Sequence, residues 1–406
     1  MLTKYDVIVI GARCAGASTA MLLARKGHRV LLVDRASFPS DTLSTHQVHV
    51  PGIAALKRWG LLERLAATGC PPITRYSFDF GPFVIAGSPR GAEGVATAYA
   101  PRRTVLDALL VDAAAEAGVE VRQSFGVDDL LMEDRVVTGI RGRAAGGAQV
   151  VERGTLVIGA DGLHSLVART VQAQTYHERP ALEAGYYAYW SGVPTQEFEV
   201  YIRPYRSFAA IPTHDNLLCI VATWPISEFE TNRHAIEASY NNTLELAPLF
   251  AERVKRGRRE SRIVGTGDLP NFFRKPFGPG WALVGDAGYH KDPCTAQGIS
   301  DAFRDAELLA SAIDEFAGGR SFEAAMTDYQ DTRDAAVLPL FELTCEIATL
   351  EPPPAEQAEF FAEVSKNKSA MDDFCSVIAG TLPVPEFFSA EYGQRLREAT
   401  AASSVR

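Results

Sequence analysis

Three short groups of residues combine flexible backbone with charged side chains, and together they have the chemistry of a nucleotide site. The first runs from Gly11 to Gly16, with Asp34 following in the sequence. Glycines let a phosphate approach the backbone closely, and an acid roughly twenty residues further on accepts hydrogen bonds from a ribose. The other two groups are Asp161-Gly162 and Gly285-Asp286.

The first group lies where a βαβ unit is expected. Apolar residues predict a strand over 7–10, a helix over 17–25 and a second strand over 29–33 that is followed by Asp34. One residue departs from the pattern G-x-G-x-x-G, because Arg13 occupies its middle glycine. Its guanidinium is suited to neutralising a pyrophosphate. Taken alone, this incomplete motif is equally compatible with an ordinary strand–helix turn.

The two later groups each follow a predicted strand, over 156–160 and 281–284. Either has a simpler interpretation, because Asp-Gly is common in turns and a Gly-Asp pair can cap a helix. In an open α/β sheet, however, ligands bind at the carboxyl ends of the strands, where distant segments meet. The three groups, followed by a helix start at Gly298, therefore favour one shared site.

Composition narrows the class of protein. The chain has 406 residues, 47% of them apolar, and a net charge of −10, which argues against nucleic acid as a partner. Six scattered cysteines predict neither disulfides nor a metal site. No apolar run approaches the roughly 18 residues of a membrane span, and no signal-peptide pattern is present. We therefore expect a cytoplasmic protein.

A second sheet is predicted between residues 185 and 224, where apolar and polar residues alternate, and a helix over 227–255 follows it. Its aromatic side chains are candidates for a substrate pocket, although aromatic residues at strand spacing are more often part of a core, and the two uses can coexist. They are Tyr186, Trp190, Phe208 and Trp224. After residue 316 the chain is predicted to be mostly helical, with breaks at 352–354 and Gly380.

Three histidines are candidates for acid–base chemistry. His46 and His49 follow Asp34 in a polar loop, and His290 follows Asp286. A histidine near a redox cofactor can donate or accept a proton at neutral pH. A hydrogen-bonded structural role is the favoured explanation for His46 and His49, and for His290 it explains the residue as well as a catalytic role does. We select His46 and His290 as catalytic candidates.

This order of motifs resembles the class A flavoprotein monooxygenases, the aromatic hydroxylase superfamily that includes flavin halogenases and geranylgeranyl reductases. The resemblance covers about residues 5–316. It implies an α/β protein with a Rossmann-like FAD-binding domain of the GR2 type, an inserted antiparallel β-sheet substrate domain and a helical C-terminus. The implied bounds are 1–72, 98–175 and 270–325 for the FAD-binding domain, 73–97 and 176–269 for the substrate domain, and 326–406 for the helical region.

The resemblance also implies a cofactor site. Asp34 would bind the adenosine ribose, the backbone at Val127 the adenine, and Asp286 the ribityl chain. The N-terminus of the helix at Gly298 would stabilise negative charge on the reduced flavin. The residues implied to contact FAD are Gly11, Ala12, Arg13, Cys14, Ala15, Gly16, Asp34, Arg35, His46, Arg103, Val127, Asp161, Gly162, Asp286, Pro293, Ala296, Gly298 and Ile299.

The implied activity is an FAD-dependent monooxygenase that uses NAD(P)H and O2 to oxygenate an aromatic or lipophilic small molecule through a flavin C4a-hydroperoxide. The sequence has no second complete nucleotide motif, so NADPH or NADH would bind transiently. A reductase of lipophilic double bonds and a halogenase are alternatives. Both are weakened at 207–213, where the expected tryptophans are absent and Thr213 replaces the reductase lysine. A non-catalytic flavin-binding protein is a further alternative, which Arg13 leaves open.

Overall fold

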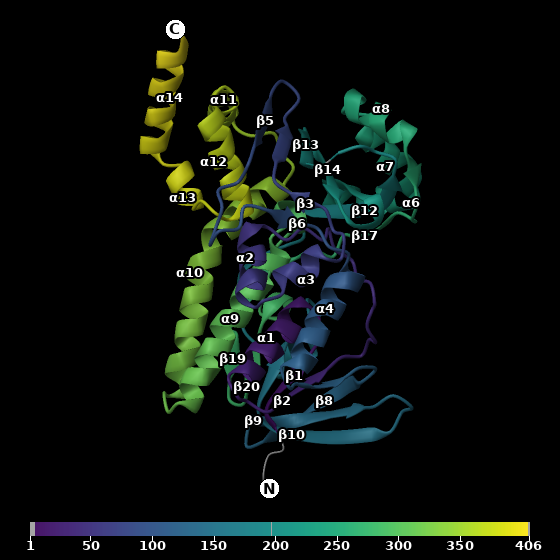
Figure 1. Cartoon of the computed structure of the whole chain (residues 1–406), viewed down its shortest axis with the longest axis vertical. Coiled ribbons are helices and arrows are strands. Elements are labelled where there is room, and N and C mark those ends of the chain that lie inside the picture. The colour runs from purple at the N-terminus through teal and green to yellow at the C-terminus, as the bar shows by residue number, and fades with distance from the viewer. Residues whose placement is uncertain (1–4, 196, 405–406) are drawn as a thin grey trace.

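Two large sheets, joined by segments that cross between them, form the framework of the protein. The computed structural model describes residues 5–195 and 197–404. In Figure 1 the first sheet occupies the lower half, and the second lies in the upper half beside the helices that cover it. The long helix α10 runs along the left edge toward the C-terminal helices.

The first sheet has the strand order β19-β20-β10-β1-β2-β7, and β9 and β8 continue from β10 as an antiparallel extension. Strands β20, β10, β1, β2 and β7 are parallel. Ile10 pairs with both Val33 and Gly159, so the carboxyl ends of three strands lie level. The strand bounds are β1 Tyr5–Ile10, β2 Val30–Val33, β7 Glu120–Arg122, β8 Gly126–Glu133, β9 Val136–Arg143, β10 Gln149–Gly159, β19 Phe277–Gly278 and β20 Trp281–Leu283.

Alternating side chains of this sheet serve two different cores. Val7 and Val9 of β1 pack with a group of helices on one face, whereas Ile8 and Ile10 pack against β8 and β9 on the other. A strand that is buried on both faces is continuously apolar, which explains the sequence of β1. The helices on the first face are α1 Cys14–Arg25, α2 Val50–Arg58, α4 Arg103–Glu116 and α9 Gly298–Ala317.

The second sheet has the order β16-β12-β15-β14-β13-β4-β5, with β17 also paired to β12. It is antiparallel except where β4 runs parallel to β13. Helices α6 to α8 cover one face, and the C-terminal helices pack on the other. The bounds are β4 Tyr76–Asp79, β5 Val84–Gly87, β12 Glu183–Ser191, β13 Phe198–Arg203, β14 Arg206–Pro212, β15 Leu218–Pro225, β16 Arg258–Arg259, β17 Val264–Thr266, α6 Phe229–His234, α7 Ile236–Leu244 and α8 Pro248–Arg256.

Smaller elements connect the two sheets. A further sheet has three strands in the order β11-β18-β21, and β21 belongs to the loop that follows Asp286. The remaining bounds are β3 Pro72–Ile73, β6 Ala98–Tyr99, β11 Thr175–Arg179, β18 Asn271–Arg274, β21 Tyr289–His290, α3 Leu62–Ala66, α5 Leu166–Thr170, α10 Phe322–Ala348, α11 Ala355–Val364, α12 Lys368–Ala379, α13 Val384–Phe387, α14 Ala390–Ser404, and the 3₁₀ turns η1 His214–Asn216, η2 Ile226–Glu228, η3 Gly285–Ala287 and η4 Pro293–Thr295.

The predicted α/β fold with a second sheet and a helical C-terminus is confirmed, but two helices are shorter than expected. Apolar positions over 51–68 predict one helix, but α2 ends at Arg58 and α3 begins at Leu62, because Gly60 adopts a left-handed backbone (φ +75°). The helix predicted over 227–255 is three helices, and Pro248 begins the last of them. In the described part of the chain, no helix combines the length and apolar character that a membrane crossing requires.

Candidate active site

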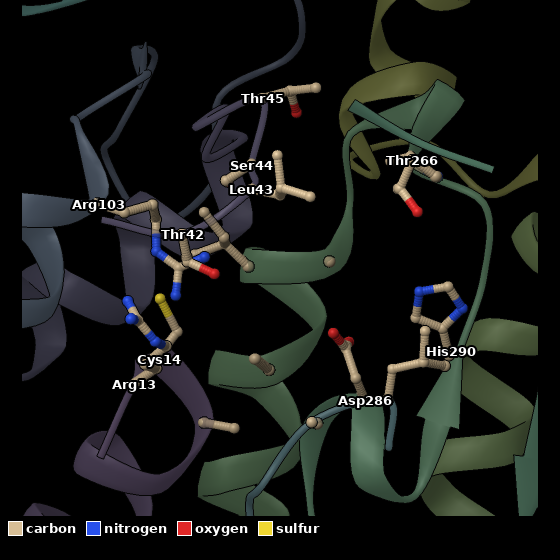
Figure 2. A pocket seen from close by; sticks show the side chains of 18 of the residues that line it. Arg13, Cys14, Thr42, Leu43, Ser44, Thr45, Arg103, Thr266, Asp286 and His290 are labelled. Carbon is tan, nitrogen blue, oxygen red and sulfur yellow. The ribbon is translucent and has the colours of Figure 1, made fainter. Parts of the chain in front are cut away.

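A single cavity of about 910 Å³ runs from the carboxyl ends of the parallel strands to the second sheet. Figure 2 shows Arg13, Cys14 and Arg103 on one side of it, with Asp286 and His290 across the cavity. Thr42, Leu43, Ser44 and Thr45 also line it. The segments predicted to share a site therefore meet around one space.

The glycine-rich turn after β1 is packed too tightly for side chains at both of its end glycines. Gly11 has φ +101°, and a Cβ there would lie 2.3 Å from the Ala160 carbonyl oxygen. A Cβ at Gly16 would lie 1.8 Å from the Gly11 carbonyl oxygen. Arg13 has an extended backbone (φ −89°), which any residue adopts, so this position does not require the glycine of the usual motif.

Two arginines face the cavity beside this turn and share one carboxylate. Arg13 Nη1 lies 2.5 Å from Asp107 Oδ2, and Arg103 Nε lies 3.0 Å from Asp107 Oδ1. Arg13 also donates to the backbone carbonyl of Asp41 at 3.1 Å. Two guanidinium groups with one carboxylate leave a net positive charge, which suits a diphosphate.

Asp34 organises the opposite edge of the turn. Its Oδ2 accepts a hydrogen bond from the Ala12 amide and its Oδ1 from the Ala36 amide, each at 2.7 Å. Asp34, Arg35 and Val127 all line the cavity. Each carboxylate oxygen keeps a second lone pair for a ribose hydroxyl. Ala12 and Gly16 lie in the core of the turn, whereas Gly11, Arg13, Cys14 and Ala15 line the cavity.

The Asp161 side chain caps a helix. Its Oδ1 accepts from the Ser165 hydroxyl at 2.5 Å, and its Oδ2 accepts from the Leu166 amide at 2.6 Å, at the start of α5. The Asp161 side chain therefore has a structural role as a helix cap, whereas the simpler interpretation of Asp-Gly from the sequence was a turn. Asp161 and Gly162 nevertheless line the cavity, and Gly162 (φ +79°) leaves open space where a Cβ would project.

The loop that ends at α9 completes the far end of the cavity. The exposed carboxylate of Asp286 points into the space (Figure 2). Pro293, Ala296, Gly298 and Ile299 line the wall, and a Cβ at Gly298 would meet no atom within 4 Å. A group seated there would face the positive end of a 20-residue helix.

These features fit FAD. The basic end suits its diphosphate, Asp34 suits a ribose, and the open surface at Gly298 before a helix N-terminus suits an electron-accepting ring. Arg13 follows β1, Asp34 follows β2 and Gly298 ends the loop after β20, whereas Arg103 is the first residue of α4.

The three histidines occupy different environments. His46 is fully buried outside the cavity wall, where its Nε2 lies 2.5 Å from the Tyr189 hydroxyl, and burial lowers its pKa to about 3. His49 is also buried, and burial lowers its pKa to about 4. His290 lines the cavity, half-buried, and its Nδ1 is bonded to the Pro270 carbonyl. Only His290 among them reaches the cavity.

The aromatic candidates lie mainly on the other face of the second sheet. Tyr186 and Trp224 pack together beneath α6–α8, and the Trp190 Nε1 donates to Tyr240 at 3.1 Å. Phe208 packs in the same core and also borders the cavity. Alternation predicted two faces, but it could not decide which face the helices cover. The side chains on the cavity face are Tyr187, Phe198, Val200, Ile211 and Val221.

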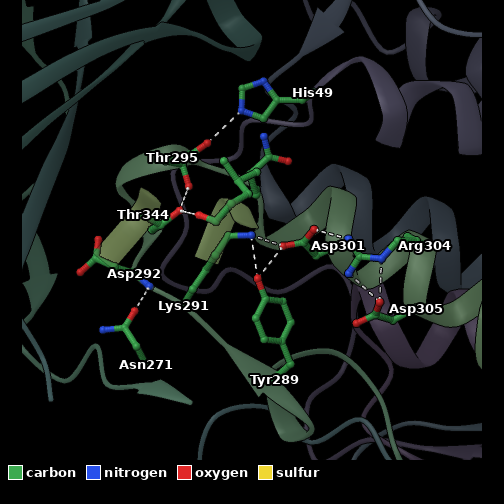
Figure 3. A network of polar contacts seen from close by, with 12 residues as sticks. His49, Asn271, Tyr289, Lys291, Asp292, Thr295, Asp301, Arg304, Asp305 and Thr344 are labelled. Atoms are coloured by element: carbon green, nitrogen blue, oxygen red, sulfur yellow. Dashed lines mark hydrogen bonds and ion pairs between the residues drawn. The ribbon is translucent and has the colours of Figure 1, made fainter. Parts of the chain in front are cut away.

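A buried polar network fixes the loop beneath the cavity (Figure 3). Lys291 Nζ lies 2.5 Å from Asp301 Oδ2 and donates to the Tyr289 hydroxyl at 2.8 Å. Arg304 bridges Asp301 and Asp305 at 2.7 and 2.6 Å. Burial would raise the pKa of Asp301, but Lys291 and Arg304 together lower it. The network ties the loop to the first turns of α9.

His49 reinforces the same loop. Its Nε2 lies 3.1 Å from the Thr295 carbonyl oxygen and its Nδ1 lies 2.6 Å from the Tyr76 hydroxyl. A carbonyl only accepts, so Nε2 carries the proton and Nδ1 accepts from Tyr76. His49 thus joins α2, β4 and the loop before α9.

Sequence reasoning missed two acids beside the cavity, Glu183 and Asp292. Glu183 is the first residue of β12 and lines the cavity, and Asp292 precedes Pro293. Both are almost completely buried. The available signal was a carboxylate at the start of an otherwise apolar strand, which is unusual because burying a charge is costly.

The sequence profile of a family described as FAD binding domain matches residues 4–343. The chain is 27% identical to phenazine 1,6-dicarboxylic acid hydroxylase of Lysobacter antibioticus, an alignment that covers 91% of this chain and 98% of that protein. It is 25% identical to digeranylgeranylglycerophospholipid reductase 1 of Methanococcoides burtonii, with coverage of 77% and 75%.

Two further comparisons concern halogenating enzymes. The chain is 24% identical to tryptophan 2-halogenase of Chondromyces crocatus over 80% of its own length, and it spans only 64% of that enzyme. A solved structure of a flavin-dependent brominase superposes with a TM-score of 0.81 at 19% identity, covering 98% of this chain and 99% of that one. At that identity the superposition establishes the fold.

Proposed function

Because this chain belongs to the FAD binding domain family, we propose that it is an FAD-dependent monooxygenase. It would use NADH or NADPH and O2 to oxygenate an aromatic or lipophilic small molecule. The observation that carries the proposal is the continuity of the cavity, which joins a basic, glycine-lined end to an apolar end.

The residues at the first end are suited to holding the cofactor. Arg13 and Arg103 would neutralise the diphosphate, Asp34 would bind the ribose, and Asp286 would accept hydrogen bonds from the ribityl chain. Bound FAD supplies the capacity to take two electrons from a nicotinamide and pass them to oxygen. Gly162 and Gly298 leave the room that such a cofactor needs.

The residues at the second end are suited to a substrate. An apolar wall that would exclude water and position a hydrophobic molecule is formed by Tyr187, Phe198, Ile211 and Val221. Excluding water protects a reactive oxygen species from wasteful breakdown. The N-terminus of α9 would stabilise negative charge on the reduced ring.

A reductase of lipophilic double bonds is the second candidate, supported by the similarity to the archaeal reductase. The structure gives one reason to rank it lower. Thr213, which stands where the reductases carry lysine, is fully buried and donates to the Ala100 carbonyl at 2.6 Å. Its hydroxyl therefore holds a loop and is committed to the protein.

The test uses purified, FAD-loaded protein with a panel of aromatic and lipophilic compounds. We expect substrate-dependent consumption of NADH or NADPH and O2, with an atom of labelled O2 appearing in the product. Reduction of the substrate under anaerobic conditions would instead identify a reductase. Product formation that requires bromide or chloride would identify a halogenase. A protein that binds no flavin would contradict all three.

A further inference from the structure

Arg13, the residue at the middle glycine of the motif, directs its guanidinium to other parts of the protein. Nη1 donates to the Asp107 carboxylate at 2.5 Å and to the Ser40 carbonyl at 3.4 Å. Nη2 donates to the Ser40 hydroxyl at 3.2 Å and to the Asp41 carbonyl at 3.1 Å. These acceptors account for all four N–H groups of Nη1 and Nη2, so the Nε–H remains for a ligand.

Three of these bonds end on a loop over residues 40–45 that forms part of the cavity wall. The loop residues that line the cavity are Asp41, Thr42, Leu43, Ser44 and Thr45. In Figure 2 the loop leads from Thr42, beside Arg103, to Thr45, farther from the basic end. The Leu43 side chain is 50% exposed, so burial contributes little to holding the middle of the loop. The contacts at its two ends therefore decide where it lies.

The far end of the loop reaches the substrate wall through His46. The His46 ring is fully buried, stacks on Tyr189 with 5.8 Å between ring centroids, and meets Tyr187 edge-on at 6.2 Å. Both tyrosines belong to β12 of the second sheet, and Tyr187 lines the cavity. The His46 backbone is left-handed (φ +67°), a conformation that side chains other than glycine seldom adopt, so these contacts must hold it.

The neighbouring arginines show that holding the loop is a role separate from supplying charge. Arg103 Nε and Nη2 each lie 3.0 Å from Asp107 Oδ1, and in the described part of the chain no hydrogen bond joins Arg103 to the loop. Arg102 Nη2 donates to the Asp41 carboxylate at 3.3 Å, a partly exposed contact that contributes little alone. Arg13 and Arg103 therefore both add positive charge to the cofactor end, but only Arg13 also bonds to the loop backbone.

We propose that Arg13 is a positioning residue that holds the loop over 40–45 in the cavity wall, between the cofactor end and the substrate wall. The charge of its guanidinium serves the diphosphate, whereas its directed N–H groups serve the loop. A glycine at this position, as in the usual motif, would leave Ser40 and Asp41 without these bonds. The inference rests on the FAD site of the proposed function but not on oxygenation, so it applies equally to a reductase or a halogenase.

The experiment measures FAD affinity and hydrogen exchange at residues 40–46 in the same variants, with exchange followed at saturating FAD. Arg13→Gly removes both the charge and the bonds. Arg13→Lys keeps the charge, but a single ammonium cannot span the acceptors that a planar guanidinium reaches. We expect both variants to speed exchange in the loop at least about fivefold, because it opens more often. Arg13→Lys should keep the Kd for FAD within about threefold, whereas Arg13→Gly should raise it about tenfold.

Arg103→Lys is the matched control, because Arg103 shares Asp107 with Arg13 but makes no bond to the loop. It should weaken FAD binding and leave exchange at 40–46 unchanged. Loop exchange that stays at the level of the unaltered protein in either Arg13 variant would overturn the inference, since charge alone would then suffice. So would an equal increase in Arg103→Lys, which would mean that any change at the basic end loosens the loop.

The unaltered protein decides the question even if a variant folds poorly. Adding FAD to the flavin-free protein should leave exchange at 40–46 unchanged or slower, because Arg13 keeps its bonds to the loop. Faster exchange would show that the diphosphate takes Arg13 away from the loop and would overturn the inference. If the protein bound no flavin, the proposed function would fail, while exchange in the flavin-free variants would still test the hold of Arg13 on the loop.

Discussion

Glu183 is expected to make the stability of the protein depend on pH. Burial raises its pKa in the folded state, whereas in the unfolded chain it titrates near the ordinary value of about 4.3. The stabilising effect of its proton is therefore fully present below about pH 4.3 and is lost as pH rises through the folded pKa. Replacing it with a neutral amide should remove that loss.

We therefore expect Glu183→Gln to gain stability relative to the unaltered protein as pH is raised, measured by urea denaturation of the protein across the pH range. Glu260→Gln is the control. Its carboxylate has a lowered pKa because of hydrogen bonds from Ser191 and Arg258, so its loss should act in the opposite direction. If the effect of Glu183→Gln on stability does not change with pH, the raised pKa of Glu183 in the folded protein is contradicted.

Two glycines provide a test of the cofactor site. A methyl group at Gly298 meets open space in the cavity, so Gly298→Ala should fold with unchanged or slightly higher stability. If the flavin packs there, the methyl group should cost about 1–3 kcal/mol of FAD binding free energy. Gly16→Ala should instead destabilise the protein, because its Cβ would overlap the Gly11 carbonyl.

The measurements are FAD fluorescence titration and thermal unfolding without FAD. Gly298→Ala with normal FAD affinity would show that the ring lies elsewhere, whereas Gly16→Ala with normal stability would contradict the tight turn.

Residue types and spacing predicted which segments converge better than which atoms face the ligand. Strand ends are easy to recognise in a sequence. A common position at the carboxyl edge of the first sheet could therefore be predicted for Gly11, Asp34, Asp161 and Asp286. The direction of the Tyr186 side chain could not be predicted, because it depends on which face of the second sheet the helices cover. The burial of His46 could not be predicted either, because it depends on contact with Tyr189, which is distant in the sequence.

At the level of elements, the salt-bridge network makes the loop after β21 depend on α9. Asp301→Asn would leave Lys291 buried without a carboxylate, and we expect a loss of about 3–5 kcal/mol in the free energy of unfolding. Lys291→Met should cost less, because Asp301 keeps its ion pair with Arg304 at 2.7 Å.

Chemical denaturation of the two variants checks this order. Equal losses in the free energy of unfolding would mean that the ion pair with Arg304 does not stabilise the buried Asp301 carboxylate. Asp314→Asn, at a surface pair with Lys26, should change stability very little.

The lengths of the elements were predictable only where the sequence carries a strong stop signal. Gly380, with φ +75°, ends α12 as expected. The break between α6 and α7 was missed because residues 229–246 contain neither glycine nor proline, whereas Pro248, which begins α8, was a signal in the sequence that was not used. The break between α6 and α7 lies at Ala235, whose backbone leaves the helical region (φ −126°, ψ 36°), and all three helices pack against the second sheet.

At the scale of the whole molecule, the C-terminal helices support the wall of the substrate cavity from behind. Phe374 of α12 lies 5.1 Å from Phe78 of β4, between ring centroids, in the core cluster that also contains Tyr187, Phe198 and Val221. Phe374→Ala should cost about 3–5 kcal/mol in the free energy of unfolding. Leu249→Ala, at a side chain with 87% exposure, should change it by less than about 0.5 kcal/mol.

Urea denaturation gives both values, and hydrogen exchange should rise in β4 and β13 of the Phe374→Ala protein. If hydrogen exchange rises only in α12, the C-terminal helices do not stabilise the strands that form the cavity wall.

The pairing of β4 with β13 has a consequence for how the protein is made. Residues 76–79 leave the ribosome long before their neighbour at 198–203. Strand β1 must wait for β10, and β10 in turn must wait for β20 on its other side. Neither sheet can be finished from a contiguous length of chain. A nascent fragment of half the protein therefore carries unmatched strand edges, and we expect it to rely on chaperones until synthesis passes β20.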